Sequence, residues 1–331
     1  MQTEGGGQVA RSDGVKVAPF MLCALVPLAA CTAHESLGMN LGITVDAGAG
    51  GATGTDAAVR ADVAVSADTA DGRPVAALLP TLPKPKESCP TLAGLSGSNL
   101  TLLGSAVTIW SGPAGSVGPM VFYWHATSAT SEEAVAGLGP GTAEVVRSGG
   151  VIASFTKSNG TGSNTGDYTW YTGDFGTADE VLACANQQGL IDPTHIHSAG
   201  YSPGSCQTAA MVYARAYLAS VLCYSGGAWT LGQLPDPTNP PALVGAHGAV
   251  GSDVFGIDIA TNTILFENDL KGKGSFVIDC DDGGDHLQSG PARMAGVAAP
   301  AWQFFKDHPY QVEPKPYKSV PSTFPSYCKL M

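Results

Sequence analysis

One short segment of the chain combines a candidate nucleophile with a turn that would expose it. Residues 200–204 read Gly-Tyr-Ser-Pro-Gly, the one G-x-S-x-G pattern in the sequence. A strand-like run, 195–199, precedes the pattern, and an Ala-rich run that predicts a helix over 205–217 follows it. A strand–turn–helix of this kind raises the serine hydroxyl above the edge of a sheet, beside a helix N-terminus that favours negative charge. The pattern therefore predicts that Ser202 is a nucleophile, which needs a base and an orienting acid to react.

An acid and a histidine follow Ser202 in that order, each after a strand-like run. Asp253 comes shortly after the apolar run 242–246, and His286 comes shortly after the run 275–278. Because the carboxyl ends of parallel strands meet at one edge of a sheet, we expect the three side chains to converge. His286 is predicted to act as general base and then as acid, with Asp253 orienting the imidazole and stabilising its charged form.

Other side chains compete for these roles. Asp258 is an alternative to Asp253, which is preferred because it lies nearer the end of the strand. His247 is an alternative to His286, but the His-Gly pair at 247–248 is interpreted as shaping the acid loop. His125 is interpreted as a packing or loop-orienting histidine.

The acidic run 279–285 raises the question of a metal. Its spacing departs from the D-x-D-x-D-G pattern of a calcium loop, so we interpret it as a solvated acidic turn. The sequence contains no C-x-x-C pair, which argues against zinc. We predict no metal and no cofactor.

Strand-like and helix-like runs alternate around these residues. Strands are predicted over 106–110, 119–124, 151–155, 195–199, 219–224, 242–246 and 275–278, and helices over 177–188, 205–217 and 293–306. A short helix is also predicted to open at 131–133, with Ser131 as its N-cap and two acids in its first turn. Strands separated by helices predict an α/β fold with a mostly parallel central sheet and helices on both faces. The chain order serine, acid, histidine is that of the α/β-hydrolase fold.

The loop after the predicted strand 119–124 is expected to help bind an oxyanion. It reads Trp-His-Ala-Thr over 124–127. In this fold the corresponding loop contributes a backbone N–H to the oxyanion hole. We assign that donor to Ala126 or Thr127.

Several motifs occur in order between residues 89 and 328: VFYWHATS, GDYTWYTGDF, HIHSAGYSPGSCQTAAMVYARAYLASVLCYSGG, HGAVGSD and CDDGGDH…WQFFKDHP. Together they resemble the extracellular poly(3-hydroxybutyrate) depolymerase-like and feruloyl-esterase-like α/β-hydrolases, many of which are bacterial lipoproteins. The resemblance implies ester hydrolysis through an acyl-enzyme, with Ser202, Asp253 and His286 at the triad positions. It also implies a polyester or plant-derived ester as substrate.

Two residues depart from the family pattern. The family usually has a small non-proline residue after the nucleophile and a glycine after the histidine of the upstream loop, where this chain has Pro203 and Ala126. The N–H after the nucleophile is normally the main oxyanion donor, and proline has none. Three outcomes are open: a slow esterase, an esterase that uses another donor such as the Gly204 amide, or a hydrolase-fold binding protein without catalysis. A peptidase on the same fold is a further alternative.

Two aromatic residues are candidates for substrate binding. Tyr201 directly precedes the nucleophile, and Trp170 lies in the aromatic segment GDYTWYTGDF. Trp170 could line a pocket for an aromatic ester or anchor its loop against the sheet, and the sequence leaves both interpretations open.

The first 88 residues differ from the rest of the chain. Residues 1–30 contain an apolar run of signal-peptide length, 17–30, and Leu-Ala-Ala-Cys over 28–31 resembles a lipobox. This resemblance implies cleavage before Cys31 and lipidation of its sulfur. Residues 31–88 have no Phe, Tyr or Trp and are interpreted as a disordered tether, so the catalytic domain is predicted over 89–331. The protein is therefore expected to be exported, either lipid-anchored at a periplasmic or cell-surface membrane face or secreted.

Charge and cysteine content narrow the possible partners. The formal net charge is −12 with no basic stripe, which excludes a nucleic-acid partner, and no apolar run is long enough to cross a membrane. Six cysteines lie in the predicted domain, an even number that suggests up to three disulfides: Cys89, Cys184, Cys206, Cys223, Cys280 and Cys328. Their pairing is open, and a Cys89–Cys328 bridge that ties the two ends is the first choice.

Overall fold

The computed structural model describes residues 79–331 except 159–169, 171, 252–257, 287–289, 292–294 and 313–314. The predicted signal peptide, the lipidation residue Cys31 and most of the predicted tether lie outside the described residues, as does Asp253.

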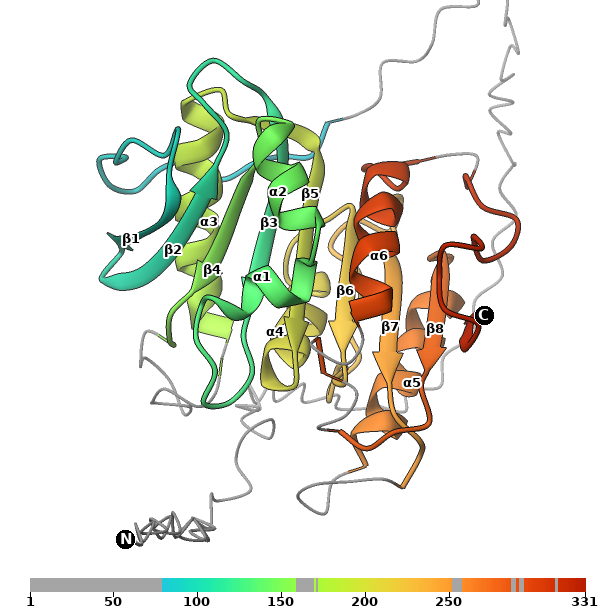
Figure 1. Cartoon of the computed structure of the whole chain (residues 1–331). Helices are drawn as coiled ribbons and strands as arrows, with labels where there is room; N and C mark the ends of the chain where they lie inside the picture. Colours follow the sequence, from blue (N-terminus) through green and yellow to red (C-terminus); the bar gives the residue numbers. More distant parts are fainter. Residues whose placement is uncertain are drawn as a thin grey trace, which may run out of the picture.

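The described residues form one nine-stranded sheet in the order β1-β2-β4-β3-β5-β6-β7-β8-β9 (Figure 1). The six strands from β4 to β8 in this order are mutually parallel, while β1, β2 and β9 run antiparallel to their neighbours. The bounds are β1 Ser96–Leu102, β2 Ser105–Ser111, β3 Gly118–Trp124, β4 Val151–Phe155, β5 Ile191–Tyr201, β6 Ser220–Tyr224, β7 Ala242–His247, β8 Val277–Asp281 and β9 Cys328–Leu330. The predicted α/β-hydrolase fold, with its mostly parallel sheet, is confirmed.

The two edge strands β1 and β9 were not predicted. Their residues are mostly exposed or half-buried, so they lack the apolar runs that mark the buried parallel strands. Pairing with an existing strand stabilises them, and their own hydrophobic pattern contributes little.

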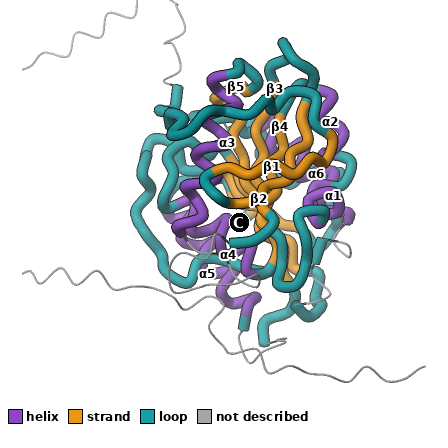
Figure 2. The backbone as a smooth tube through the Cα atoms, turned by 90° about the vertical axis from the view of Figure 1, so that its left-hand side faces the viewer, coloured by secondary structure: helices purple, strands orange, loops and turns teal. Residues whose placement is uncertain are grey.

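Helices cover both faces of the sheet (Figure 2). The helices α1 Glu133–Leu138, α2 Gly141–Arg147 and α6 Ala295–Asp307 pack on one face, and α3 Phe175–Gln187, α4 Pro203–Val212 and α5 Ile259–Gly272 pack on the other. A 3-10 turn, Thr172–Asp174, precedes α3. Helices α2 and α5 were not predicted. Asp258 explains where α5 begins, because its carboxylate accepts the Thr261 N–H at 3.0 Å as an N-cap. None of the described helices is long and apolar enough to cross a membrane.

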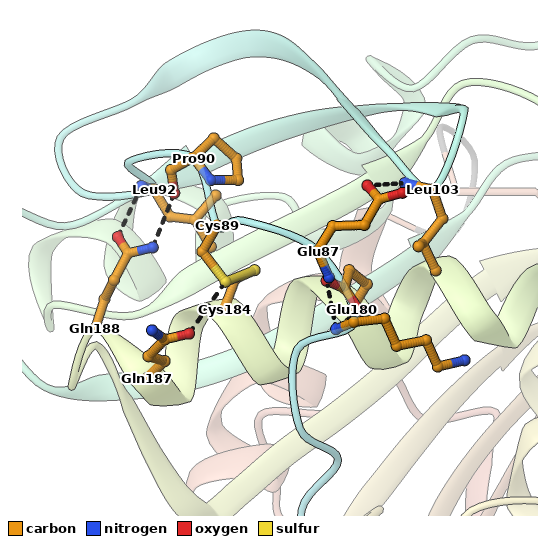
Figure 3. Close-up of a disulfide and its surroundings, with 10 residues drawn as sticks. Glu87, Cys89, Pro90, Leu92, Leu103, Glu180, Cys184, Gln187 and Gln188 are labelled. Carbon is orange, nitrogen blue, oxygen red and sulfur yellow. Dashed lines mark hydrogen bonds between the residues drawn. A yellow bond between two sulfur atoms is a disulfide. The ribbon is translucent and has the colours of Figure 1, made fainter.

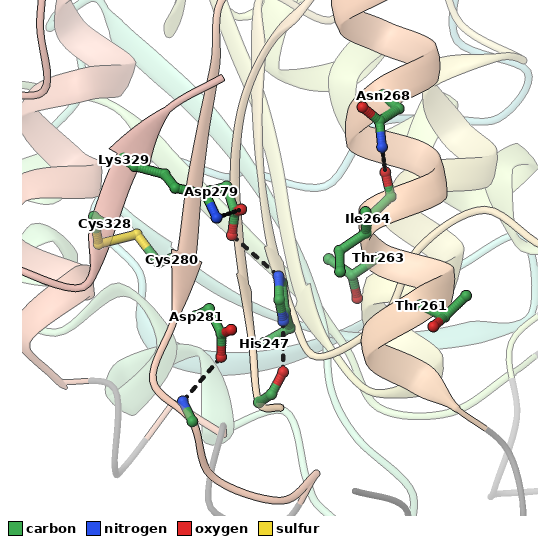
Figure 4. Close-up of polar contacts among 12 residues, drawn as sticks. His247, Thr261, Thr263, Ile264, Asn268, Asp279, Cys280, Asp281, Cys328 and Lys329 are labelled. Atoms are coloured by element: carbon green, nitrogen blue, oxygen red, sulfur yellow. Dashed lines mark hydrogen bonds and ion pairs between the residues drawn. A yellow bond between two sulfur atoms is a disulfide. The ribbon is translucent and has the colours of Figure 1, made fainter. Parts of the chain in front are cut away.

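The predicted Cys89–Cys328 bridge is wrong. Cys89 bonds to Cys184 on α3, and Cys280 on β8 bonds to Cys328 on β9 (Figures 3 and 4). The two ends of the domain cannot meet, because β9 lies at one edge of the sheet while α3 packs near β1 and β4 at the other end. Cys206 and Cys223 take part in no disulfide among the described residues.

The last part of the predicted tether belongs to the folded domain. The backbone N–H groups of Lys86 and Glu87 donate to the carboxylate of Glu180 on α3 at 2.9–3.0 Å (Figure 3). Leu82 also packs against the apolar core. A buried carboxylate that accepts backbone donors fixes this segment in a way that its low-aromatic composition did not predict.

Candidate active site

Ser202 lies at a strained turn between β5 and α4. Its φ angle is +55°, a conformation that L-residues rarely adopt, and its N–H donates to the Tyr224 carbonyl on β6 at 2.9 Å. The glycines around it are required by close packing. A Cβ on Gly204 would lie 1.8 Å from the Trp124 carbonyl oxygen, and a Cβ on Gly200 would lie 2.2 Å from the Gly204 carbonyl oxygen. The G-x-S-x-G segment therefore forms the sharp strand-to-helix turn that the sequence predicted.

His286 reaches Ser202 from the loop after β8. Its Nε2 lies 2.8 Å from the Ser202 Oγ, a hydrogen-bonding distance at which the imidazole can take the hydroxyl proton. The ring is buried, with 5% of the residue exposed. The structure thus brings together two of the three predicted catalytic side chains.

The other ring nitrogen of His286 contacts a residue that the sequence analysis missed. Its Nδ1 lies 2.7 Å from the Oγ of Ser225, which is buried directly after β6 and has φ +45°. An Nδ1–H that donates to Ser225 leaves the Nε2 lone pair directed at Ser202. A polar residue at the carboxyl end of the strand beside β5 was the available signal, but only the sheet order shows that Ser225 neighbours the nucleophile.

Tyr201 holds the backbone of the histidine loop. Its hydroxyl donates to the His286 carbonyl at 3.0 Å, and the two rings lie 5.5 Å apart. Burial, followed by the charges of Glu133 and Asp285, raises the pKa of Tyr201 to about 12, so the hydroxyl stays protonated and able to donate. These contacts give Tyr201 a positioning role, whereas the sequence analysis expected it to bind substrate.

The two competing candidates have other partners. Asp258 caps α5, as described above, and also accepts the Thr261 hydroxyl at 2.8 Å. His247 pairs with Asp279 on β8, its Nε2 lying 3.0 Å from Oδ1. Asp279 is therefore a buried strand residue and was wrongly grouped with the acidic turn. Asp281 and Asp282 do form that turn, where their carboxylates accept the N–H groups of the two following glycines at 2.9 Å.

On the side of Ser202 where an oxyanion would bind, two of the expected N–H donors are absent or already bonded. Pro203 occupies the first turn of α4 and has no N–H to donate. The N–H of Ala126, one of the predicted donors, instead donates to Glu133 Oε1 at 3.1 Å. The Tyr123 hydroxyl donates to the same oxygen at 3.0 Å. The assignment of Ala126 as an oxyanion donor is therefore not met in this structure, because a half-buried carboxylate already takes its hydrogen bond.

Glu133 is itself electrostatically unusual. Burial raises its pKa to about 7, although the hydrogen bonds from Tyr123 and Ala126 partly oppose this shift. Near neutral pH the carboxyl group thus exchanges between charged and neutral forms beside the loop 124–127. The sequence predicted it only as one of two adjacent acids in the first turn of a short helix, which gave no sign of its burial or of its contact with the loop 124–127.

The remaining candidate donors lie where this loop meets α4. Gly204 is buried, and a Cβ there would also lie 2.9 Å from the His125 carbonyl oxygen, so the loop packs directly on the first turn of the helix. Thr127 follows in the same loop. These two amides remain the proposed donors of the oxyanion hole.

Trp170 and His125 anchor the loop. The indole N–H of Trp170 donates to the His125 carbonyl at 2.8 Å, and the residue is 7% exposed. Its ring packs edge-on against Trp124 at 5.3 Å. The His125 ring nitrogens lie 2.8 Å from the carbonyl oxygens of Ala126 and Thr156, which confirms the predicted loop-orienting role. Of the two interpretations of Trp170, these contacts favour the anchor.

Comparison with known proteins gives a structural likeness only. No family model matches the sequence, and no curated protein sequence is similar to it. A thermostable esterase is 10% identical with a TM-score of 0.48, over 65% of this chain and 63% of that one. An acylaminoacyl peptidase of Pyrococcus horikoshii is 12% identical with a TM-score of 0.47, over 66% of this chain and 42% of that one. A Thermus thermophilus protein is 16% identical with a TM-score of 0.43, over 64% of this chain and 97% of that one. This chain spans less than two thirds of the first two proteins, and these likenesses say nothing about its activity.

Proposed function

We propose that the protein is a serine hydrolase that cleaves carboxylic esters through an acyl-enzyme. The observation that supports this proposal is the 2.8 Å contact between the Ser202 hydroxyl and His286 Nε2 at a strained strand-to-helix turn. In the proposed reaction, Ser202 Oγ attacks the ester carbonyl carbon as its proton passes to His286 Nε2. The imidazolium then protonates the departing alcohol, leaving an acyl-serine. Water, activated by the same nitrogen, attacks the acyl-serine and releases the acid and the free hydroxyl.

The Nδ1 side of the imidazole must be held throughout this cycle. The His286 Nδ1 lies 2.7 Å from the Ser225 Oγ, which we assign as an acceptor of the Nδ1–H, and Tyr201 fixes the His286 backbone. We propose that Asp253 supplies the negative charge that stabilises the imidazolium. Thr127 and Gly204 are the proposed amides for the tetrahedral oxyanion.

The substrate class is proposed on the sequence resemblance. We propose an exogenous polyester of the poly(3-hydroxybutyrate) type, or a feruloyl or acetyl ester, cleaved outside the cytoplasm. In this proposal the protein is exported by its first 30 residues and held at a membrane by a lipid on Cys31. A Cys31→Ser variant that leaves the detergent-rich phase for the aqueous phase would support the anchor, and unchanged partition would contradict it.

A second candidate function is ligand binding without turnover. The absence of an N–H at Pro203 and the engagement of the Ala126 N–H by Glu133 favour it, because both remove donors from the position where an oxyanion would form.

A fluorophosphonate probe and an ester-turnover assay together separate the two functions, because the probe labels only an activated serine and turnover also requires a stabilised oxyanion. We expect stoichiometric labelling of the wild type, none of Ser202→Ala, and full labelling of Ser148→Ala, which changes an exposed serine at the C-cap of α2. An inert wild type with an intact fold would support the binding protein. A panel of hydroxybutyrate, feruloyl and acetyl esters, with an amide analogue to detect a peptidase, then assigns the substrate.

A further inference from the structure

A second cluster of chemically active side chains lies under the loops that follow β7 and β8. His247 ends β7, Asp279 lies on β8, and Glu267 lies on α5, which packs over both strands. All three residues are buried, with 1%, 4% and 0% exposure respectively. One potential ligand atom from each lies within 4.8 Å of the others.

The Glu267 carboxylate points to a missing partner. It is fully buried, and neither of its oxygens has a hydrogen-bond partner among the described residues. The fold makes room for it in this position, because a Cβ on Gly245 would lie 1.9 Å from its Oε1. A buried carboxylate without a partner is costly, so a cation or a proton must neutralise it.

The two other residues are already arranged as ligands usually are. His247 Nδ1 lies 2.6 Å from the Gly248 carbonyl, where an Nδ1–H can donate, so Nε2 is the atom that an ion would bind after displacing the proton that Nε2 shares with Asp279 (Figure 4). Asp279 divides its oxygens: Oδ1 faces His247 at 3.0 Å, and Oδ2 faces Lys329 Nζ at 3.0 Å (Figure 4). One carboxylate oxygen thus points into the cluster while the other is held from outside.

We propose that His247, Glu267 and Asp279 bind a divalent first-row transition ion such as Zn²⁺. One imidazole nitrogen with two carboxylate oxygens is a ligand set that such ions accept. A tetrahedral ion about 2.0–2.2 Å from each atom places its ligand atoms about 3.3–3.6 Å apart. The three atoms here lie within 4.8 Å of one another, and His247 Nε2 lies 3.0 Å from Asp279 Oδ1, so binding requires side-chain adjustments of up to roughly an ångström. This proposal departs from the sequence prediction of no metal, which tested only the calcium and C-x-x-C patterns.

The ion would have a structural role close to the candidate active site. The His247 carbonyl accepts the Asp282 N–H at 3.0 Å, and the Ala249 N–H donates to the Gly284 carbonyl at 2.8 Å. These bonds join the start of the loop after β7 to the start of the loop after β8, which carries His286. A bound ion therefore ties both loops to α5.

The test uses the full chain without an affinity tag. Metal content is measured by mass spectrometry before stripping with a chelator and after reloading with Zn²⁺, and Tm is measured in each state. We expect close to one Zn²⁺ per chain and a Tm about 5–10 °C above that of the stripped protein. Glu267→Gln should lose both the ion and the Tm shift. The control is Asp281→Asn, on the strand β8 that also carries Asp279 but outside the cluster, and it should keep both the ion and the Tm shift.

Two results would overturn the proposal. One is a stripped wild type that neither retains Zn²⁺ after reloading and dialysis nor changes its Tm, which would mean that a proton neutralises Glu267. The other is a Glu267→Gln variant that binds Zn²⁺ like the wild type. If that variant does not fold, the Co²⁺-loaded wild type decides: d–d absorption bands without a thiolate charge-transfer band support the site, and no bound Co²⁺, or a thiolate band, contradicts it.

Discussion

The two sides of Ser202 are built differently. On the β6–β8 side, hydrogen bonds of 2.7–3.0 Å connect Ser202, His286, Ser225 and Tyr201. On the β3 side, proline replaces one oxyanion donor, and the N–H of Ala126 is taken by Glu133. The described contacts therefore connect the nucleophile with its base and with the residues that hold that base, whereas on the oxyanion side one N–H group is absent and another is bonded to Glu133.

This difference predicts that the reaction of Ser202 with an electrophilic probe and the turnover of an ester are affected unequally. A serine that can be activated reacts with a strong electrophile even where the oxyanion is poorly stabilised. Turnover of an ester also requires the transition-state charge to be stabilised. We therefore expect labelling by a reactive probe to be robust and ester hydrolysis to be slow, and each prediction below tests one side of that contrast.

The largest effect is expected from removing the base. His286→Ala should lower kcat for an activated ester by about 10³–10⁴-fold or more, because nothing then takes the Ser202 proton. Steady-state kinetics measure the loss. His247→Ala addresses the rival base, and a loss of kcat there that equals the loss in His286→Ala at unchanged fold would exchange the two assignments.

The second prediction concerns Glu133 and the way the free energy of unfolding depends on pH. Glu133 has a folded pKa of about 7 against an ordinary value of 4.5, so the folded state binds its proton more tightly than the unfolded state. Its contribution to the free energy of unfolding is therefore fully present below about pH 4.5. That contribution is lost as the pH rises towards 7 and beyond, and the loss is at most about 3 kcal/mol.

Glu133→Gln should remove that slope, since a neutral amide does not titrate and can still accept from Ala126. Urea unfolding at pH 4.5, 6 and 8 measures the free energy at each pH. Glu132→Gln, at the exposed neighbouring acid, is the control and should keep the wild-type slope. An unchanged slope in Glu133→Gln would mean that this carboxyl group titrates normally.

Restoring an oxyanion donor should have the next largest effect. Pro203→Ala places an N–H directly after the nucleophile, and one such donor is worth about 10²–10³ in rate. We expect kcat for an activated ester to rise by up to about 10²-fold, with probe labelling unchanged. A kcat that falls or stays constant would show that the oxyanion is bound by other groups and that the contrast drawn above is wrong.

The smallest effect tests the residue that only the structure identified. Ser225→Ala removes one hydrogen-bond partner of the His286 Nδ1, and we expect kcat to fall about tenfold while KM changes little. The pH–rate profile should also shift, because the hydrogen bond stabilises one protonation state of the imidazole. Ser225→Thr keeps the hydroxyl and should recover most of the rate. Equal losses in both variants would indicate that Ser225 acts only through packing.

The sequence by itself determined the local pieces of this site. The G-x-S-x-G pattern specified the turn, because a Cβ on either glycine would lie only 1.8–2.2 Å from a neighbouring carbonyl oxygen. The apolar runs specified the six parallel strands. His286 was identified because it follows a buried strand, a relation that is local along the chain.

Only the tertiary structure decided which distant residues became partners. Ser225 contacts His286 across 61 positions, and Cys89 pairs with Cys184 across 95. Neither pairing follows from spacing, because each depends on which strands are neighbours and which helix covers them. The same holds for Glu133 and Glu267, whose unusual environments arise from burial by other elements and leave no trace in the residues beside them.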